Sequence, residues 1–117
     1  MILENKNIIT PDNWLGLHLK KDNIDIVKLF STFYGGYLDG DSWRLNSGCK
    51  NIKKYPDNKD KFLITGYSGT QYNIFKKNIG TSSYTSTILN EIIEKSKSEN
   101  IEVFIIDDIL KLQELLN

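Results

Sequence analysis

The sequence predicts a single α+β domain in which a mainly antiparallel β-meander carries two or three helices, in the order β-α-β-β-β-β-α-β-α. The length of 117 residues is enough for one domain and too short for two. Alternating polar and apolar residues separated by turn residues fill the middle of the chain, and apolar residues at helical spacing return after Gly80. With 39% hydrophobic residues and a net charge of zero, the chain does not belong to the disordered class.

The first portion, residues 1–41, is expected to form a strand followed by a helix. Leu15, Leu17 and Leu19 alternate with other residues, which is typical of a short half-buried strand. The helix is expected to begin at a cap formed by Asp22 or Asn23 and to end at Gly35-Gly36. Its apolar positions recur at helical spacing and are Ile26, Val27, Leu29, Phe30 and Phe33.

The second portion, residues 42–117, is expected to form a core of meander, helix, strand and helix. Strands are predicted at 43–45, 49–55, 62–65 and 71–75, with turns at 46–48, 56–58 and 66–69. The turn at 46–48 has the alternative of a β-bulge within one long strand.

The remainder of this portion is expected to form a helix, a strand and a second helix, in that order. An amphipathic pattern predicts a helix over about 84–98. The nearly continuous apolar run 101–106 predicts a central strand of the sheet. Asp107 or Asp108 then caps a final helix.

Charge is distributed unevenly along the chain although it sums to zero. Residues 1–41 carry a net charge of −2, residues 42–80 carry +6 and residues 81–117 carry −4. The basic stretch includes Arg44, the only arginine, whose planar guanidinium suits bidentate contacts with carboxylates and phosphates. This segregation indicates an anionic partner for residues 42–80, with the alternative that the lysines pair with acidic helices of the same chain.

The sequence offers few groups for catalysis or metal binding. A serine-histidine site would need His18, the only histidine, and Ser68, whose Gly66–Gly69 turn is one residue short of a nucleophile elbow. Cys49 is expected as a small buried thiol. Neither a metal-ligand spacing nor a glycine-rich phosphate loop occurs in the sequence. We therefore expect a non-enzymatic protein with no cofactor and no metal, with acid-base catalysis by two carboxylates as the alternative.

A hydroxyl-rich segment begins the predicted helix after Gly80. Six aliphatic hydroxyls fall within residues 81–87, shortly after Lys76 and Lys77. A helix N-terminus has unpaired N–H groups and a partial positive charge, so Thr81, Ser82 and Ser83 with these lysines form a candidate anion site. The alternative is that one hydroxyl caps the helix and the others are solvated.

Aromatic residues alternate with lysines in the predicted meander. Bases can stack on such rings while lysines contact phosphates. Tyr67, Tyr72 and Trp43 are the stacking candidates, because Phe62 and Phe75 occupy positions expected in the core. Since the whole chain is neutral, a small-ligand pocket or a protein interface is favoured over a site for a long nucleic acid.

Two motifs in the basic stretch occur together. W-R-L-N-S-G at residues 43–48 is followed by F-L-I-T-G-Y-S-G-T-Q-Y at residues 62–72, and then by Lys76 and Gly80. Over residues 43–93 this arrangement resembles a family of small, uncharacterised phage and prophage proteins with a W-R-[LI]-N-S-G motif, a G-x-S-G-x-x-Y strand, a lysine and a helix. The resemblance implies a phage origin and carries no settled activity.

These observations lead to one expected function and three alternatives. We expect a non-enzymatic, phage-encoded protein that antagonises a bacterial defence system by binding a host nuclease or effector, as an anti-CRISPR-like inhibitor does. The alternatives are an oligomeric sponge for an anionic nucleotide messenger, a small nucleic-acid-binding regulator, and, last, an enzyme acting on nucleotides. The candidate binding residues are Arg44, Asn46, Ser47, Tyr67, Ser68, Tyr72, Lys76, Lys77, Thr81, Ser82 and Ser83.

The hydropathy of the chain and its first residues bear on its location. The sequence has no apolar run of membrane-spanning length, and its first six residues lack the pattern of a signal peptide. The cytoplasm of an infected bacterium is therefore the expected location, with no membrane partner. A homo-oligomer is an open alternative.

Overall fold

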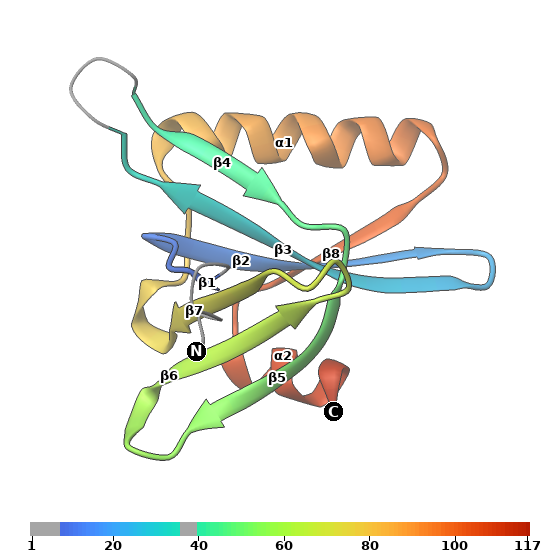
Figure 1. Ribbon diagram of the computed structural model, residues 1–117. Coiled ribbons are helices and arrows are strands. Elements are labelled where there is room, and N and C mark those ends of the chain that lie inside the picture. The colour runs from blue at the N-terminus through green and yellow to red at the C-terminus, as the bar shows by residue number, and fades with distance from the viewer. Residues whose placement is uncertain (1–7, 36–39) are drawn as a thin grey trace.

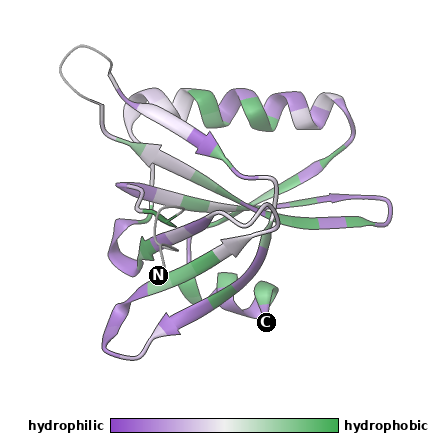
Figure 2. Cartoon of the chain, viewed as in Figure 1, coloured by the Kyte–Doolittle hydropathy of each residue, from purple (hydrophilic) through white to green (hydrophobic). Residues whose placement is uncertain are grey.

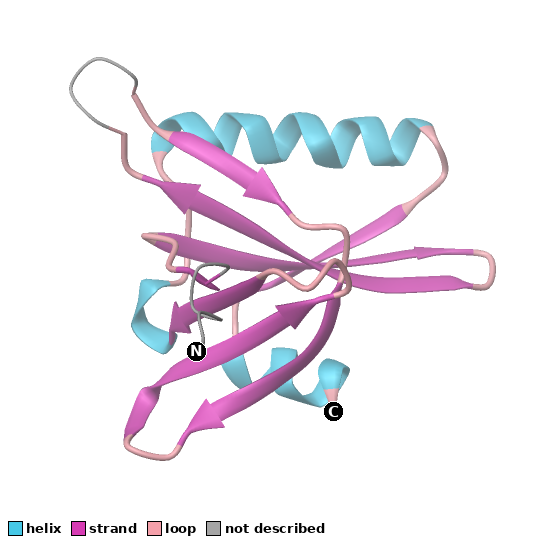
Figure 3. Ribbon diagram, in the orientation of Figure 1, coloured by secondary structure: helices cyan, strands magenta, loops and turns pink. Residues whose placement is uncertain are grey.

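Two four-stranded sheets and two helices form the protein, which confirms the α+β class (Figures 1 and 3). The computed structural model describes residues 8–35 and 40–117. Its strands are β1 (Ile8–Ile9), β2 (Asn13–Lys21), β3 (Ile24–Phe33), β4 (Ser42–Leu45), β5 (Cys49–Tyr55), β6 (Asn58–Gly66), β7 (Gln71–Phe75) and β8 (Glu102–Ile106). Its helices are α1 (Ser83–Ser98), α2 (Ile109–Leu116) and a short 3-10 turn, η2 (Lys76–Asn78).

The strands divide between a hairpin sheet and a meander sheet. The hairpin sheet has the order β4-β3-β2-β8 and is antiparallel throughout. The meander sheet has the order β1-β7-β6-β5, with β1 parallel to β7 and the other pairs antiparallel. The expected single meander is therefore only its last three strands, because β4 pairs with β3 in the other sheet. The hairpin sheet thus combines strands from residues 1–41 and from residues 42–117.

The helix expected after Asp22 is wrong, since residues 24–33 are strand β3. Asp22 and Asn23 form the two-residue loop of a long β2–β3 hairpin, in which Lys21 pairs with Ile24. Asp22 has a φ of 52°, which is typical of such a loop. Strand β3 is apolar on both faces because both faces of its sheet are covered. The resulting order of apolar residues along the strand also fits the spacing of a helix. Gly36, expected at the helix end, lies outside the described residues.

Strand β8 lies at an edge of the hairpin sheet, so its expected central position is also wrong. One side of β8 pairs with β2 from Gly16–Ile106 to Lys20–Glu102. Phe104 and Ile105 are each 48% exposed, which is unusual for a central strand.

The hairpin sheet forms the middle layer of the molecule. On one face α1 packs against Leu15, Leu17 and Phe30 through Leu89. On the other face lie the meander sheet and α2, around a larger core whose members are Trp14, Val27, Leu29, Cys49, Ile52, Phe62, Ile64, Tyr72, Ile74, Ile106, Ile109 and Leu112. The fully buried Trp14 links the two sheets, because its indole Nε1–H donates to the Phe75 carbonyl at 2.8 Å.

The two C-terminal helices confirm the sequence pattern. Helix α1 begins at Ser82, which forms a capping box with Thr85, and the Thr85 hydroxyl is hydrogen-bonded to Thr32 of β3 at 2.8 Å. Helix α2 begins at Asp108, whose carboxylate accepts from the Leu110 N–H at 3.0 Å. Within residues 8–35 and 40–117, neither helix has the length and apolar character needed to cross a membrane.

Candidate anion-binding site

The residues predicted for binding lie in three separate places. Arg44, Tyr72 and the two glycine turns gather where the chain passes from the hairpin sheet to the meander sheet, here called the corner. Lys76 and Lys77 lie in η2, which follows the far end of β7. Thr81, Ser82 and Ser83 lie at the start of α1, where Ser82 is the N-cap and Ser83 the first helical residue.

Asn46 shapes the corner and is buried, with 6% of its surface exposed. Its backbone N–H donates to the Leu29 carbonyl at 3.2 Å, and its side-chain oxygen accepts from the Leu29 N–H at 2.8 Å. Its amide nitrogen reaches the Gly48 carbonyl at 3.4 Å and the Cys49 sulfur at 3.5 Å. These contacts use the polar atoms of Asn46 within the fold, and they replace the strand pairing that β3 loses where β4 ends.

The two glycine turns meet at the corner. The Tyr67 N–H donates to the Gly48 carbonyl at 3.0 Å. Gly48 has a φ of 152°, and a Cβ there would lie 2.8 Å from Ile26 Cδ1 and 3.0 Å from Tyr67 Cδ2, so only glycine fits. Ser47, Tyr67 and Ser68 are exposed at this place.

Arg44 stands over Tyr72 beside the corner. Its Nε donates to the Tyr72 hydroxyl at 3.1 Å, and its guanidinium carbon lies 5.9 Å from the centre of the ring. Tyr72 is only 1% exposed, so its ring is not accessible for stacking on a base. In the part of the chain that the structure describes, the ion pairs are His18–Asp25 and Lys97–Glu94, so Arg44 does not pair there with an acid such as Asp107.

A carboxylate already occupies the surroundings of the α1 N-terminus. Asp41 accepts from the Gly35 N–H at 3.1 Å, and this bond, together with a weaker one from the Ser82 side chain, lowers the pKa of the Asp41 carboxyl. The capping box satisfies Ser82 and Thr85. An incoming anion would therefore meet a negative charge at this end of the helix.

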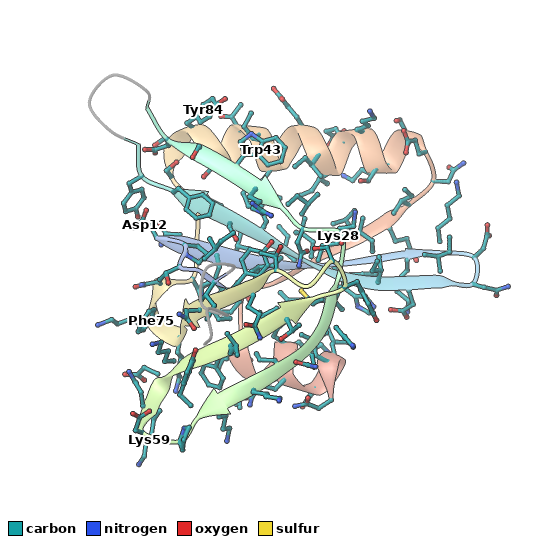
Figure 4. All side chains as sticks on the ribbon, in the orientation of Figure 1. Asp12, Lys28, Trp43, Lys59, Phe75 and Tyr84 are labelled. Atoms are coloured by element: carbon teal, nitrogen blue, oxygen red, sulfur yellow. The ribbon has the colours of Figure 1, made fainter. Side chains whose placement is uncertain are left out.

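A concentration of positive charge with an apolar floor lies at the far end of the meander sheet. There the β5–β6 turn, η2 and the start of α2 enclose a depression of about 420 Å³, here called the basic depression. Its lining residues are Lys54, Tyr55, Pro56, Lys59, Phe62, Lys76, Ile109, Leu110 and Gln113. Figure 2 shows the hydrophilic colour of the β5–β6 turn and of η2, and Figure 4 shows Lys59 at the tip of this hairpin.

Local sequence explains how the lysines reach the basic depression. Tyr55 pairs with Asn58 across a tight turn, so Lys54 and Lys59 lie on adjacent strand ends. A register shift between Lys54 and Tyr55 turns the end of β5, and the 3-10 turn after β7 brings Lys76 to the same place. Helix α2 supplies the apolar wall.

The lysines of the basic depression have no acidic partner among residues 8–35 and 40–117, where the only ion pairs lie elsewhere. This disfavours the alternative that the basic stretch is neutralised by the protein's own acidic helices. Three neighbouring ammonium groups raise the local positive potential, which an anion would relieve. Lys54, Lys59, Leu110 and Gln113 were missed as site residues. The Pro56-Asp57 turn between two lysines was the available signal for the first two.

The outer surface of the meander sheet continues the basic character beyond the depression. The Lys61 ammonium lies 4.5 Å from the centre of the Tyr55 ring and 5.9 Å from that of Phe75. The Tyr55 hydroxyl donates to the side-chain oxygen of Asn73. Phe75 is only partly buried and lies at this surface, whereas Phe62 is buried in the core.

The groups considered for catalysis are dispersed. His18 is hydrogen-bonded to Asp25 within the β2–β3 hairpin, whereas Ser68 lies in the β6–β7 turn of the other sheet. Burial raises the pKa of the Cys49 thiol to about 11, although a hydrogen bond with Asn46 opposes this shift. Over the described ranges, no three potential metal ligands gather to hold an ion.

No family of known proteins matches the chain, and no curated protein or solved structure matches it. The likeness to small phage proteins rests on the two motifs at residues 43–48 and 62–72. In the structure these motifs build the corner and contribute Phe62 to the basic depression.

Proposed function

We propose that the chain is a non-enzymatic, phage-encoded binding protein that antagonises a bacterial defence system by holding an anionic nucleotide in the basic depression. The observation that carries the proposal is the convergence of Lys54, Lys59 and Lys76 around one apolar hollow without an acidic partner among the described residues. Arg44 does not line this hollow and takes no part in the proposed binding.

The shape and chemistry of the hollow fit a nucleotide better than a bare phosphate. A volume of about 420 Å³ lies in the range of small-molecule sites. Phosphates would contact the three ammonium groups, because charge-assisted hydrogen bonds are the strong ones. The base would lie against Tyr55, Pro56 and Leu110, which give the hollow its apolar side.

The proposed phage origin is supported by the resemblance of the two motifs to small phage proteins. It is also supported by the composition, since many Ile, Lys and Asn residues and no Ala are what the codons of an AT-rich genome produce. A small protein that sequesters a nucleotide messenger would silence a defence effector without touching it. Sequestration needs affinity and no chemical step.

An inhibitor that binds a host nuclease or effector is the competing mechanism. The observation that favours it is the exposure of all seven acidic residues of positions 81–117, which would let the acidic surface of α1 or that of α2 imitate nucleic acid. These residues are Glu91, Glu94, Glu99, Glu102, Asp107, Asp108 and Glu114. Such an inhibitor would bind through these acidic residues and would not depend on Lys54 or Lys76.

Calorimetric titration with ATP and with cyclic di-AMP tests the proposal. The variant Lys54→Glu/Lys76→Glu is compared with Lys95→Glu/Lys97→Glu, which makes the same change of net charge at exposed positions of α1. Loss of two charged hydrogen bonds, each of about 1.5–3 kcal/mol, predicts at least a 100-fold loss of affinity in the first variant. The control variant should bind as the wild type does.

Three results would contradict the proposal. Neither nucleotide binds, both double variants lose affinity equally, or the recovered nucleotide has a changed mass. A titration with single-stranded dT20 at two salt concentrations identifies a nucleic-acid binder by tighter, steeply salt-dependent binding. Native mass spectrometry after incubation with bacterial lysate identifies an effector inhibitor by a bound protein that persists in Lys54→Glu/Lys76→Glu.

A further inference from the structure

The outer edge of β8 is an open strand edge with apolar side chains on both faces. Only one side of β8 is paired, with β2, and within the described residues no hydrogen bond reaches the backbone of its other side. Phe104 and Ile105 are each 48% exposed although they point to opposite faces of the sheet. Both the backbone and the side chains of this edge are therefore available for a partner.

The edge has few of the features that usually protect a sheet from pairing, and Glu102 is its one charged residue. Its sequence E-V-F-I-I contains neither proline nor lysine, and its pairing with β2 continues without a register shift. A shallow depression flanks it on each face of the sheet. The depression beside the end of α1 has a volume of about 460 Å³ and includes Lys97 and Val103, and the one beside α2 has about 310 Å³ and includes Phe104 and Lys111.

We propose that two copies of the chain form a two-fold dimer by antiparallel pairing of β8 with β8, centred on Phe104. In this register Phe104 meets Phe104 of the second copy, and Val103 meets Ile105 of the second copy. The two hairpin sheets become one continuous eight-stranded sheet. The assembly is closed, because the two-fold axis uses the β8 edge of both copies.

At its three central positions, residues 103–105, the register matches apolar side chains with apolar side chains on both faces. Phe104 shares the α2 face with His18 of β2, with which it is in register. In the dimer the two Phe104 rings cover each other there. On the opposite face each exposed Ile105 enters the depression of the other copy beside Val103.

The register also matches opposite charges. Glu102 lies on the same face as Phe104 and Ile106, since side chains alternate along a strand. The two-fold axis places Glu102 of one copy opposite Ile106 of the other, and Lys111 lines the same depression as Ile106. In the proposed dimer each Glu102 therefore lies near Lys111 of the other copy, in addition to Lys20 of its own chain, which is its register partner on β2. This charge complementarity favours a second copy over an unrelated strand.

This interface is independent of the proposed nucleotide site. Lys54, Lys59 and Lys76 do not line either depression beside β8. Loss of dimerisation would therefore leave nucleotide binding intact, and the two proposals fail separately.

Sedimentation equilibrium over a concentration series tests the dimer. The wild type should reach twice the monomer mass, and Ile105→Asp should remain monomeric with an unchanged circular dichroism spectrum. Ile24→Asp at the tip of the β2–β3 hairpin is the matched control, because Ile24 is 62% exposed and lies on β3, which does not pair with β8, and it should dimerise as the wild type does.

Charge reversal tests the register without touching the apolar contacts. In a homodimer of Glu102→Lys or of Lys111→Glu, residue 102 of each copy faces a like charge at residue 111 of the other copy. Each variant should therefore weaken its homodimer roughly tenfold. An equimolar mixture of the two variants should restore the dimer, since both contacts then join opposite charges. A monomeric wild type up to millimolar concentration, a dimeric Ile105→Asp, or a mixture that remains as weak as the single variants would each overturn the proposal.

Discussion

Asn46 and Ser47 are neighbours in one motif, but the structure gives them different roles. The stabilities of Asn46→Ala and Ser47→Ala should distinguish these roles. Asn46 is buried and hydrogen-bonded to Leu29, whereas the Ser47 side chain is exposed. Asn46→Ala removes the acceptor of the Leu29 N–H at a place where Leu29 itself is fully buried. We expect this variant to unfold much more easily than Ser47→Ala.

The magnitude follows from the contacts that are lost. A buried N–H left without an acceptor costs about 1–3 kcal/mol. The two bonds from the Asn46 amide nitrogen are long, at 3.4 and 3.5 Å, and add little. The truncated side chain leaves a small cavity, so the total loss is about 3 kcal/mol of the free energy of unfolding. Ser47→Ala should change this free energy by less than about 0.5 kcal/mol.

Urea denaturation followed by tryptophan fluorescence measures both variants. With a slope of about 1.5 kcal/mol per molar urea, typical of a small domain, the midpoint of Asn46→Ala should fall by about 2 M. Trp14 is buried between the sheets and reports their separation. Equal midpoints for the two variants would refute the assignment of Asn46 to the corner. Reduced nucleotide binding by a fully stable Asn46→Ala would instead support a direct binding role.

Three further outcomes follow from single interactions. Burial raises the pKa of the Cys49 thiol to about 11, so Cys49 should resist iodoacetamide at pH 8 in the native protein and react fully in urea. Mass spectrometry of the intact chain measures both reactions. Rapid alkylation of the native protein would contradict the burial of Cys49. Trp14→Phe removes the donor to the Phe75 carbonyl and should lower the free energy of unfolding by about 1–3 kcal/mol in urea titrations, and an unchanged urea midpoint would contradict the role of this hydrogen bond. Asp41 has a lowered pKa in the folded state, chiefly through the Gly35 N–H, so its contribution to stability is present above its ordinary pKa and is lost as the pH falls through the folded-state pKa. The stability difference between wild type and Asp41→Asn, measured in urea, should therefore be constant from about pH 7 to about pH 5 and shrink as the pH falls below about 4, and a difference that grows on acidification would contradict the direction of this shift.

Local patterns predicted the elements that have one covered face or a strong cap. Helix α1 combines one apolar stripe with a Ser82 cap, and α2 begins at an aspartate, so both were predictable from neighbours in sequence. Strand β3 was not, because helix α1 covers one of its faces and the other sheet covers the opposite one. A strand buried on both sides has apolar residues at positions 26, 27, 29 and 30, and this spacing also fits a helix.

The position of β8 shows a second limit of local patterns. A continuous apolar run is typical of a strand covered on both faces, but Phe104 and Ile105 of β8 are each 48% exposed. The run also does not distinguish the middle of a sheet from an edge. Whether a strand lies in the middle or at an edge depends on how far the other strands of the sheet extend. This is decided by pairing between residues that are distant in sequence. The same run therefore predicted a strand correctly and its place in the sheet wrongly.

The candidate site was predictable only in part for the same reason. The charge count located the basic stretch, and Lys76 was among the candidates. The depression exists because residues 109–113 pack beside the β5–β6 turn, which lies far away in sequence. Motif residues such as Asn46 drew attention for their polarity, but their hydrogen bonds are satisfied within the fold.

The pairing of β2 with both β3 and β8 has a consequence for the order of folding. The β2–β3 hairpin closes over two residues and can form early, whereas Leu17 must wait for Ile105 to be synthesised. Until then the nascent chain presents the leucines of β2 beside an unpaired strand edge, a state that chaperones bind and that aggregates when crowded. The synthesis of β8 therefore limits how soon the newly made chain can complete the hairpin sheet and avoid misassembly.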